Sequence, residues 1–419
     1  MLTAKVPEIK KTPEELKRLS RSERVRLLYE SREKAILDEQ ARKYMAHKEG
    51  LAEGERKKAI EDAPRVAFLL RDAGEGGAER SSLRLANGLA RSGYSVRLLF
   101  LKAAGPLLAS ADPSVETAEL GRGLRSFPLL TREMNRADFV LPVYTSMRAL
   151  LAKALFRTRA RVVLSQRNMF TMDRGLVQTR LRFLRCRLLY PHAGACVCVS
   201  RGVADEMRTL GLLPEEKIHV VYNPVVTDEL LTQAETPPNH PWFGGGAPPV
   251  VLGAGRLGDQ KDFATLIRAF ALAARERKDL RLLILGEGRQ RPALEKLIRG
   301  LGLADRASLP GYAVNPYSCM KRAALFVLTS RFEGFGNVVA EALACGCNVV
   351  STDCRSGPSE ILDGGKYGRL ARVGDPEDVA RQILAALADP LPSALLRERA
   401  SFFSESRAVE GWRTVFERI

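Results

Sequence analysis

Short apolar runs alternate with helical stretches twice along this chain, and this alternation constrains the fold more than any other feature of the sequence. The first series begins at Arg65–Leu70 and the second at Val250–Gly253. Strands that alternate with helices form a parallel sheet, which helices must cover on both faces. The sequence therefore predicts an α/β protein with two doubly wound, Rossmann-like domains and a cleft between them.

The residue pattern predicts the individual elements of both series. The predicted strands are Arg65–Leu70, Val96–Leu101, Phe139–Val143, Arg161–Ser165 and Ala195–Ser200, then Val250–Gly253, Arg281–Leu285, Ala324–Leu328 and Cys347–Ser351. The predicted helices are Arg80–Arg91, Ser146–Phe156, Thr179–Tyr190 and Gly202–Leu210, then Phe263–Arg277, Pro292–Leu301, Val338–Ala344 and Pro376–Ala388.

A length of 419 residues fits two domains with an appendage. A polar stretch rich in Pro and Gly lies between the two series, and we expect a linker there, at 226–248. The first domain is then expected at 64–225 and the second at 249–419. A last helix, at about 404–419, is in a position to pack back on the first domain.

Residues 1–60 have a different composition, with many charges and apolar residues at loose helical spacing, which predicts a charged helical extension. Within it, the stretch from Leu19 to Gly54 resembles the helical tail of transposase-type PD-(D/E)XK nucleases. No nuclease catalytic motif accompanies this stretch, so no activity is inferred from it. A solvated extension or a partner-binding arm is the favoured interpretation.

Cysteine content and apolar run lengths bear on the cellular compartment. No apolar run approaches the roughly 20 residues of a membrane span, and no charged-then-apolar leader opens the sequence. The seven cysteines are odd in number and begin only at Cys186, which argues against a disulfide framework. We expect a reducing compartment and a cytosolic or membrane-surface protein.

The net charge of +17 is unevenly distributed. Residues 121–190 hold 15 Lys and Arg against three acidic residues, an excess of +12, and residues 1–60 contribute +5. A basic region of this kind favours an anionic partner, which could be lipid headgroups, a phosphorylated substrate or nucleic acid. A solvated basic surface is the alternative.

Two loops that follow predicted strands of the second series carry residues suited to a phosphate ligand. After Val250–Gly253, Gly255 gives the backbone room to approach a ligand, and Arg256 and Lys261 supply two cations before the next helix. A guanidinium and an ammonium together suit a diphosphate. After Arg281–Leu285 comes the permissive turn Gly286-Glu287-Gly288.

A third loop runs from Glu333 into the helix that contains Glu341. Gly334 and Gly336 give clearance, and the N–H groups of Phe335–Val338 at the helix start form an anion site. Two carboxylates that flank an anion site suit a ligand with sugar hydroxyls on both sides of a phosphate. The alternative is an ordinary helix start with one acid near the helix dipole and one in solvent.

Together these motifs resemble the signature of the retaining family-4 glycosyltransferases, which have the GT-B fold. The resemblance rests on Arg256 with Lys261, the Gly286-Glu287-Gly288 turn and the E-x7-E pair Glu333/Glu341. It continues through Leu343–Gly346, Gly357–Leu362 and Gly368, and covers about residues 64–419.

The resemblance implies a donor site for a nucleotide-sugar. Arg256 and Lys261 would bind the diphosphate, Glu333 the sugar hydroxyls and Glu341 the ribose, with the base near Tyr312–Val314. Glu333, Arg256 and Lys261 are the implied catalytic residues. The positive charges of Arg256 and Lys261, with the backbone amides, would stabilise the departing nucleoside diphosphate. The resemblance implies no cofactor beyond the UDP-sugar co-substrate and no metal, and the sequence agrees in having no D-x-D triplet. The implied donor-binding set is Gly255, Arg256, Lys261, Gly286, Glu287, Val314, Glu333, Gly334, Phe335, Gly336, Asn337, Val338 and Glu341.

The acceptor side is expected in the first domain. The turn after Arg65–Leu70 resembles the GGAER segment of the same family, which implies acceptor-side roles for Gly76, Gly77, Glu79 and Arg80. Many members have a histidine after the strand at Arg161–Ser165. This chain has Ser-Gln-Arg-Asn, similar to members that act on lipid-linked glycans with N-acetylhexosamine. Arg167 and Asn168 are therefore expected in the cleft, and no catalytic base can be named.

The basic region lies in this acceptor-side domain. Within it, Arg180–Tyr190 interleaves apolar and basic residues, as in a helix at a membrane interface, although a domain helix with its apolar side in the core fits equally. The pairs Cys196/Cys198 and Cys345/Cys347 lack C-x2-C spacing and are interpreted as packing residues.

The sequence thus predicts a retaining glycosyltransferase that moves a hexose or N-acetylhexosamine from a UDP-sugar, less favourably a GDP-sugar, to a membrane-linked glycan. Cell-surface polysaccharide, lipopolysaccharide or glycoprotein-glycan synthesis would use this reaction. The expected location is cytoplasmic, at the inner face of the cytoplasmic membrane, with basic residues 121–190 on anionic lipid.

Two alternatives remain. One is a nucleic-acid-binding or interaction protein that uses the basic arm and patch, and the other a non-catalytic GT-B nucleotide-binding protein. Aromatic residues make up only 6% of the chain and form no stacking motif, so no nucleic acid is expected.

Overall fold

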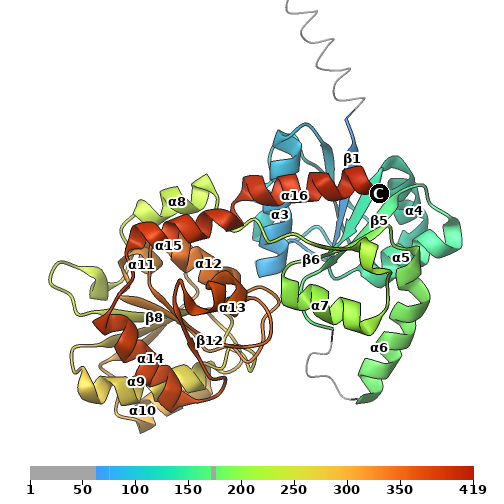
Figure 1. The fold of residues 1–419 in the computed structure, drawn as a ribbon. Helices are drawn as coiled ribbons and strands as arrows, with labels where there is room; N and C mark the ends of the chain where they lie inside the picture. The colour runs from blue at the N-terminus through green and yellow to red at the C-terminus, as the bar shows by residue number, and fades with distance from the viewer. Residues whose placement is uncertain (1–62, 75, 171–175) are drawn as a thin grey trace, which may run out of the picture. The chain divides into compact units, whose positions relative to one another are not determined.

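The structure is a computed structural model that describes residues 63–74, 76–170 and 176–419. Residues Pro64–Ile419 form one compact unit. The predicted extension at 1–60, with its nuclease-like stretch, lies outside the described residues. Figure 1 shows two sheets, each with its own helices. The predicted α/β architecture of two doubly wound, Rossmann-like domains is confirmed.

The first domain is built on a parallel sheet with the order β3-β2-β1-β4-β5-β6-β7. Its strands are β1 (Arg65–Leu70), β2 (Ser95–Phe100), β3 (Glu116–Glu119), β4 (Phe139–Pro142), β5 (Arg161–Gln166), β6 (Ala195–Cys198) and β7 (Ile218–Val220). Its helices are α3 (Gly77–Arg91), α4 (Phe127–Arg136), α5 (Ser146–Phe156), α6 (Leu176–Leu189) and α7 (Arg201–Leu210).

The second domain has a parallel sheet with the order β10-β9-β8-β11-β12-β13. Its strands are β8 (Val250–Ala254), β9 (Arg281–Leu285), β10 (Ala307–Gly311), β11 (Leu325–Leu328), β12 (Val349–Thr352) and β13 (Arg369–Ala371). The helices from the end of the first sheet onward are α8 (Asp228–Glu235), α9 (Phe263–Glu276), α10 (Arg291–Gly300), α11 (Tyr317–Arg322), α12 (Asn337–Ala344), α13 (Pro358–Ile361), α14 (Pro376–Ala388), α15 (Ser393–Ala400) and α16 (Glu405–Arg418).

Alternate residues of each strand enter opposite cores, as a sheet covered on both faces requires. In β8, Val251 joins the buried cluster formed with α9, α10 and α14. Its neighbours Val250 and Leu252 join the cluster on the opposite face, with α11, α12 and α15. The near-continuous apolar strands of the sequence therefore reflect burial on both faces.

Both sheets reverse their strand order at one point, between β1 and β4 in the first domain and between β8 and β11 in the second. In open α/β sheets, ligands bind beyond the carboxyl ends of the strands at such a switch point. The loops that follow β1, β4, β8 and β11 are therefore the ones that position a site.

The C-terminal helix α16 packs on the first domain rather than on the sheet that precedes it in the sequence. Trp412, Val415 and Phe416 are buried in the core that covers β1 and β2. The Phe416 ring stacks on Phe139 with centroids 4.4 Å apart. The chain thus crosses between the domains twice, after β7 and before α16, and Figure 1 shows α16 lying beside α3.

The structure differs from the expected elements mainly at short or edge segments. The predicted linker contains the helix α8, whose Leu230 and Ala234 are buried. Thr227 caps this helix by accepting from the N–H of Leu230. Because the helix begins with polar residues, the sequence predicted a linker here instead. The unpredicted strands β3, β7, β10 and β13 have three to five residues, and the edge strand β3 (ETAE) lacks an apolar run.

Candidate functional site

Lys261 and Glu333 form a mostly buried ion pair at the switch point of the second domain. The Lys261 Nζ lies 2.6 Å from Glu333 Oε1, and the side chains are 16% and 9% exposed. Ser330 Oγ donates to the same carboxylate oxygen at 2.7 Å. Among the described residues Glu333 Oε2 has no partner, so it remains available to accept from a ligand hydroxyl.

Hydrogen bonds between the loops after β8 and β11 explain this placement. Asp262 caps α9 from a left-handed conformation, with φ of 45°, so Lys261 directly precedes the helix. The Thr329 hydroxyl donates to the carbonyls of Lys261 and Asp262, both at 3.0 Å. A Cβ at Gly255 would lie 3.1 Å from Lys261 Cε, so this glycine leaves room for the lysine side chain.

Arg256 and Glu287 are placed differently from Lys261. Arg256 is exposed and forms no ion pair with any described residue. The Glu287 carboxylate pairs with Arg291 at 2.7 Å, and this hydrogen-bonded pair lowers the pKa of Glu287. At Gly286, φ is +139° and a Cβ would lie 1.9 Å from the Gly255 carbonyl oxygen, so only glycine fits. The predicted turn therefore packs the loops together, while the Glu287 side chain serves a local ion pair.

The start of α12 has backbone N–H groups that no side chain caps. Gly336 caps this helix with φ of +90°, and Asn337 and Val338 are its first residues, whose N–H groups have no acceptor within the helix. The Phe335 side chain is buried and stacks with Tyr222 at a centroid distance of 5.6 Å, so only its backbone can meet a ligand. Glu341, one turn on, is 5% exposed. Val314, in the loop after β10, is 85% exposed.

The loop at Gly334 touches the first domain directly. A Cβ at Gly334 would lie 1.9 Å from the Arg167 carbonyl oxygen and 3.1 Å from Asn168 Cα. The Gly334 carbonyl accepts from Ser200 Oγ at 2.7 Å and Ser356 Oγ at 2.8 Å, one hydroxyl from each domain. The structure therefore brings the expected donor and acceptor residues together at this contact.

Asn337 ties α12 to the first domain. Its amide nitrogen donates to Ser81 Oγ at 2.9 Å and to the Gly77 carbonyl at 3.4 Å. Its amide oxygen accepts from Asn223 at 2.8 Å. The Asn337 side chain is thus used in the contact between the domains.

The residues expected on the acceptor side lie near the switch point of the first domain. Arg167 donates to Ser165 Oγ at 3.1 Å and to Asn223 Oδ1 at 3.4 Å. Burial lowers its pKa to about 10, so it still carries a charge at neutral pH. Glu79 is 9% exposed and has no hydrogen-bond partner among the described residues, and Gly76, the residue that caps α3, packs against its carboxylate.

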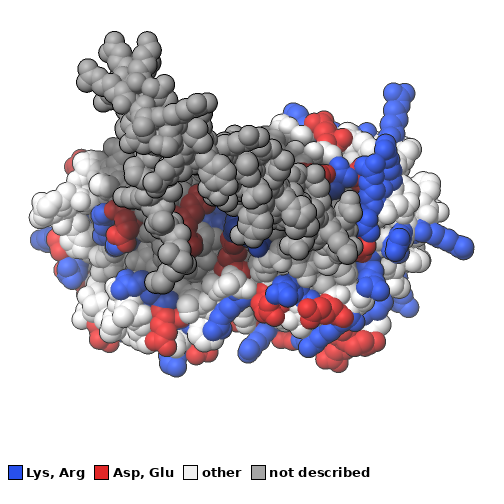
Figure 2. All heavy atoms as spheres, turned by 90° about the horizontal axis from the view of Figure 1, so that it is seen from above, with Lys and Arg blue, Asp and Glu red and all other residues white. Residues whose placement is uncertain are grey.

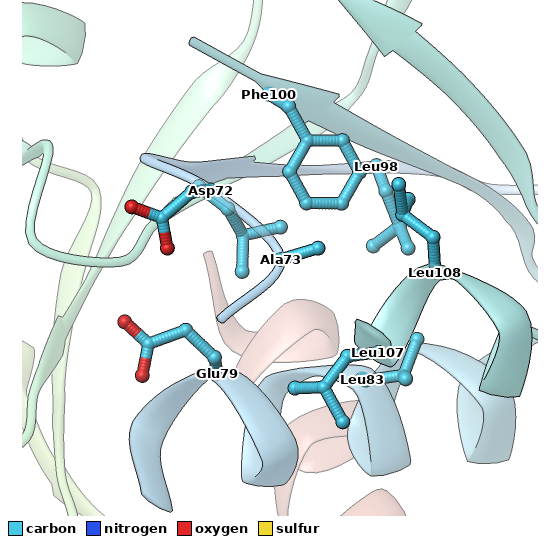
Figure 3. Close-up of a pocket in the computed structure, with 9 residues that line it drawn as sticks. Asp72, Ala73, Glu79, Leu83, Leu98, Phe100, Leu107 and Leu108 are labelled. Atoms are coloured by element: carbon cyan, nitrogen blue, oxygen red, sulfur yellow. The ribbon is translucent and has the colours of Figure 1, made fainter. Parts of the chain in front are cut away.

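A cavity of about 10 Å³, enough for about one water, lies beside Glu79 between β1, β2 and α3. Figure 3 shows the carboxylates of Asp72 and Glu79 on one side of it, away from its apolar walls. A cavity of this size is too small for a sugar. The two carboxylates, rather than the cavity, are therefore the feature that bears on ligand binding.

Tyr144 is a residue of this cluster that the sequence analysis missed. It follows β4 with φ of 59°, a left-handed conformation that costs an aromatic residue about 1–2 kcal/mol, and its side chain is 57% exposed. Its hydroxyl forms a hydrogen bond with Asn168, and desolvation of that hydroxyl together with the charge of Glu79 raises its pKa. Strain of this kind concentrates at functional sites. No sequence signal marks positive φ at a tyrosine, which is why the residue was not found.

Among the described residues, no group of three or more His, Cys, Asp or Glu could hold a metal ion. All seven cysteines are free and buried, in agreement with their interpretation as packing residues.

Two family profiles match the chain. Residues 75–229 match "Glycosyltransferase Family 4" and residues 244–403 match "Glycosyl transferases group 1", together about three quarters of the chain. Each profile therefore corresponds to one of the two sheets with its helices.

Curated relatives are similar over part of their length. The N-acetylgalactosamine-N,N'-diacetylbacillosaminyl-diphospho-undecaprenol 4-alpha-N-acetylgalactosaminyltransferase of Campylobacter jejuni is 34% identical over 203 residues, 48% of this chain and 53% of that protein. The lipopolysaccharide core biosynthesis glycosyltransferase LpsE of Rhizobium meliloti is 31% identical over 229 residues, 54% of this chain and 61% of that protein. The chain thus spans less than two thirds of the length of these relatives.

Solved structures share the fold. Anabaena HepE, crystallised with UDP and glucose, superposes with a TM-score of 0.67 at 18% identity, over 85% of this chain and all of that chain. The apo lipopolysaccharide outer core galactosyltransferase WaaB gives a TM-score of 0.63 at 18% identity, over 85% of this chain and all of that chain. With both domain profiles matched in order and the two parallel sheets in place, this chain belongs to the family-4, group 1 glycosyltransferases with the GT-B fold.

Proposed function

We propose that this protein transfers a sugar from a UDP-sugar, with retention of configuration, to a hydroxyl of a membrane-linked glycan. The Lys261–Glu333 pair beside the open start of α12 carries the proposal. A buried cation and unpaired helix N–H groups match a diphosphate, and a carboxylate with a free oxygen matches sugar hydroxyls. The bound UDP of HepE and the diphospho-undecaprenol acceptor in the name of the Campylobacter relative support the same substrate classes.

The proposed chemistry relies on stabilising the leaving group. As the bond between the sugar C1 and the diphosphate oxygen breaks, its electron pair passes to the UDP phosphate. Lys261, exposed Arg256 and the N–H groups of 335–338 stabilise that charge. The acceptor hydroxyl attacks C1 on the same face, and its proton passes to the departing phosphate oxygen. No protein base is needed, which agrees with the lack of a histidine beside Arg167.

The acceptor is proposed to lie on the cluster at the first switch point. Glu79, with no described hydrogen-bond partner, can accept from acceptor hydroxyls, and the exposed Tyr144 ring offers an apolar face to a sugar. Arg167 and Asn168 lie next to Gly334, so an acceptor held there is adjacent to the donor loop. Gly77 begins α3 beside Asn337 and completes this side of the site.

A membrane-linked acceptor agrees with the surface of α6. Its inner side packs through Cys186 and through Phe183 against Phe170. Its outer side exposes Leu181, Leu184 and Leu188, which are 50%, 55% and 66% exposed. Exposed leucines spaced by three and four residues form one face of a helix. Both interpretations of Arg180–Tyr190 thus have structural support, because one face is core and the other is apolar and exposed.

Basic side chains surround that apolar face. Arg180, Arg185 and Arg187 are exposed on α6, and the neighbouring α5 adds exposed Leu155 and Phe156. Figure 2 views the molecule from above Figure 1, on the side away from α6, and shows Lys and Arg side chains projecting from the first-domain end there as well, with acidic residues between them. Each basic residue near an anionic bilayer contributes about 1 kcal/mol of attraction. We therefore propose peripheral association with the anionic inner face of the cytoplasmic membrane.

No described helix reaches the combination of length and apolar character that a membrane crossing needs. The proposed association uses the surface of α5 and α6 alone.

Release of nucleoside diphosphate from UDP- and GDP-sugars tests the function. We expect release with a UDP-sugar that falls in Lys261→Ala and Glu341→Ala, because each loses a donor contact. The matched control is Lys296→Ala, because Lys296 is an exposed lysine on α10. Equal release by all variants would contradict the proposed site, and an absence of release with every nucleotide-sugar would contradict the function.

A further inference from the structure

The buried hydroxyl of Tyr317 connects the two domains at the proposed donor site. Tyr317 begins α11 and is 3% exposed. Its hydroxyl donates to Glu341 Oε1 at 3.5 Å and accepts from Arg84 Nη2 at 3.0 Å and Arg80 Nη1 at 3.5 Å. Both arginines come from α3 of the first domain, so one oxygen links two guanidiniums to a carboxylate of the other domain.

One of the two arginines is also held in place independently of the tyrosine. Arg84 also donates to the Val225 carbonyl at 2.9 Å, at the point where the chain leaves the first sheet. Arg80 is half-buried, and although burial lowers its pKa, the neighbouring Tyr317 hydroxyl and Glu341 carboxylate raise it overall. Arg80, expected on the acceptor side, therefore points toward the residues expected to hold the nucleoside.

Glu341 keeps hydrogen-bonding capacity for a ligand in this arrangement. It forms no direct ion pair with any described residue, and its Oε1 is met only by the Tyr317 hydroxyl. Burial and the charge of Glu341 raise the pKa of Tyr317, so the hydroxyl keeps the proton that it donates. A carboxylate that is 5% exposed but not neutralised by a cation can still accept from two hydroxyls.

We propose that Tyr317 is a positioning residue for the nucleotide: with Arg80 and Arg84 it fixes the Glu341 carboxylate so that it accepts from the ribose hydroxyls of a nucleoside diphosphate. The inference rests on the proposed function, because it assumes a nucleotide in this site. Its consequence is that α3 of the first domain takes part in nucleoside recognition, although it contributes no residue to the second sheet.

Calorimetric binding of UDP and of 2′,3′-dideoxy-UDP to the full chain tests this role. The dideoxy compound keeps the base and diphosphate but gives Glu341 no hydroxyl to hold. We expect the wild type to bind UDP about tenfold tighter than the dideoxy compound. Tyr317→Phe keeps the ring and removes only the hydroxyl, so it should weaken UDP binding about tenfold and leave dideoxy-UDP binding within about twofold.

Two further variants complete the experiment. Arg84→Gln removes the closest donor to the tyrosine hydroxyl and should produce the same selective loss, so the test holds even if Tyr317→Phe folds poorly. Tyr94→Phe is the matched control, because Tyr94 is a half-buried tyrosine whose ring packs on Phe416. It should leave the binding of both nucleotides unchanged.

The outcomes separate this inference from the function on which it rests. A Tyr317→Phe variant that binds UDP like the wild type, or that loses both nucleotides equally, overturns the positioning role. A wild type that binds UDP and dideoxy-UDP equally overturns it as well, but leaves the diphosphate site intact. A wild type that binds no nucleoside diphosphate overturns the proposed function itself.

Discussion

The Lys261 ammonium and the Glu333 carboxylate, 72 residues apart in the sequence, are joined by a 2.6 Å ion pair that is largely shielded from solvent. β8 and β11 are neighbours in the sheet, so the loops after them meet at its carboxyl edge. Each charge neutralises the other within the pair. Removal of one partner leaves the other buried without compensation, which is costly.

This pair should show strong non-additivity in stability. Lys261→Met and Glu333→Gln are each expected to lower the free energy of unfolding by about 3 kcal/mol, and the double variant by clearly less than the sum. Urea denaturation followed by circular dichroism measures all three. The exposed pair Arg277/Asp279 is the control and should change stability little. Additive losses at 261 and 333 would mean that the pair is not coupled.

Gly334→Ala tests the contact between the domains. The added methyl would meet the Arg167 carbonyl oxygen at 1.9 Å, so the loop at Gly334 cannot approach the first domain as closely. Sugar transfer should fall more than about tenfold while UDP affinity changes less, because the proposed diphosphate contacts, Lys261 and the start of α12, both belong to the second domain. Gly258→Ala, which meets no atom within 4 Å, is the control. Normal transfer by Gly334→Ala would show that this approach is not needed for catalysis.

Backbone strain at Tyr144 predicts an unusual order of stabilities. Tyr144→Gly should be more stable than Tyr144→Val by about 1–2 kcal/mol, because glycine tolerates φ of 59° and valine does not. At Thr117, an exposed position in β3, we expect the opposite order. Thr117→Val should be more stable than Thr117→Gly, because valine suits a strand better than glycine. Chemical denaturation of the four variants measures this. If valine is the more stable residue at both positions, Tyr144 is not strained in solution.

Leucines of α6 should govern membrane binding. The variant Leu184→Gln/Leu188→Gln is expected to sediment with anionic liposomes several-fold less than the wild type, because it loses apolar surface that enters the bilayer interface. Leu231→Gln, at a 41% exposed leucine of α8, should have no effect. Binding by the wild type should weaken as salt rises, since the basic residues act through screened charge. Equal sedimentation with neutral liposomes would contradict an anionic partner.

The burial of the cysteine thiols predicts slow reaction with thiol reagents and a loss of folding stability at high pH. Burial raises the pKa of Cys345 and of Cys354 to about 12, well above the value of about 8.5 in an unfolded chain. At pH 8 a thiol reagent such as DTNB should label the folded protein slowly and all seven cysteines after denaturation. As pH rises above about 8.5, thiols of the unfolded chain ionise while the folded ones do not, so stability should decline. Rapid labelling of the native protein would contradict this burial.

Much of the site could be predicted from sequence because its residues are local to strand ends. Lys261, Glu333 and Gly286 stand in short loops whose strands are marked by apolar runs, and a parallel sheet brings such loops to one edge. The roles given to them came from the family resemblance and remain proposals. Position in a loop could not show that the Glu287 side chain pairs with Arg291 or that Phe335 is buried.

The sequence by itself determined two parallel sheets and the loops that could carry a site, because burial on both faces leaves a periodic apolar signal along the chain. Only the tertiary structure decided which side chains meet. The approach of Gly334 to Arg167, the strained Tyr144, and the link from Arg84 through Tyr317 to Glu341 all depend on contacts between distant segments. Such contacts are fixed by how the two domains pack, and packing geometry leaves no local pattern for a single sequence to reveal.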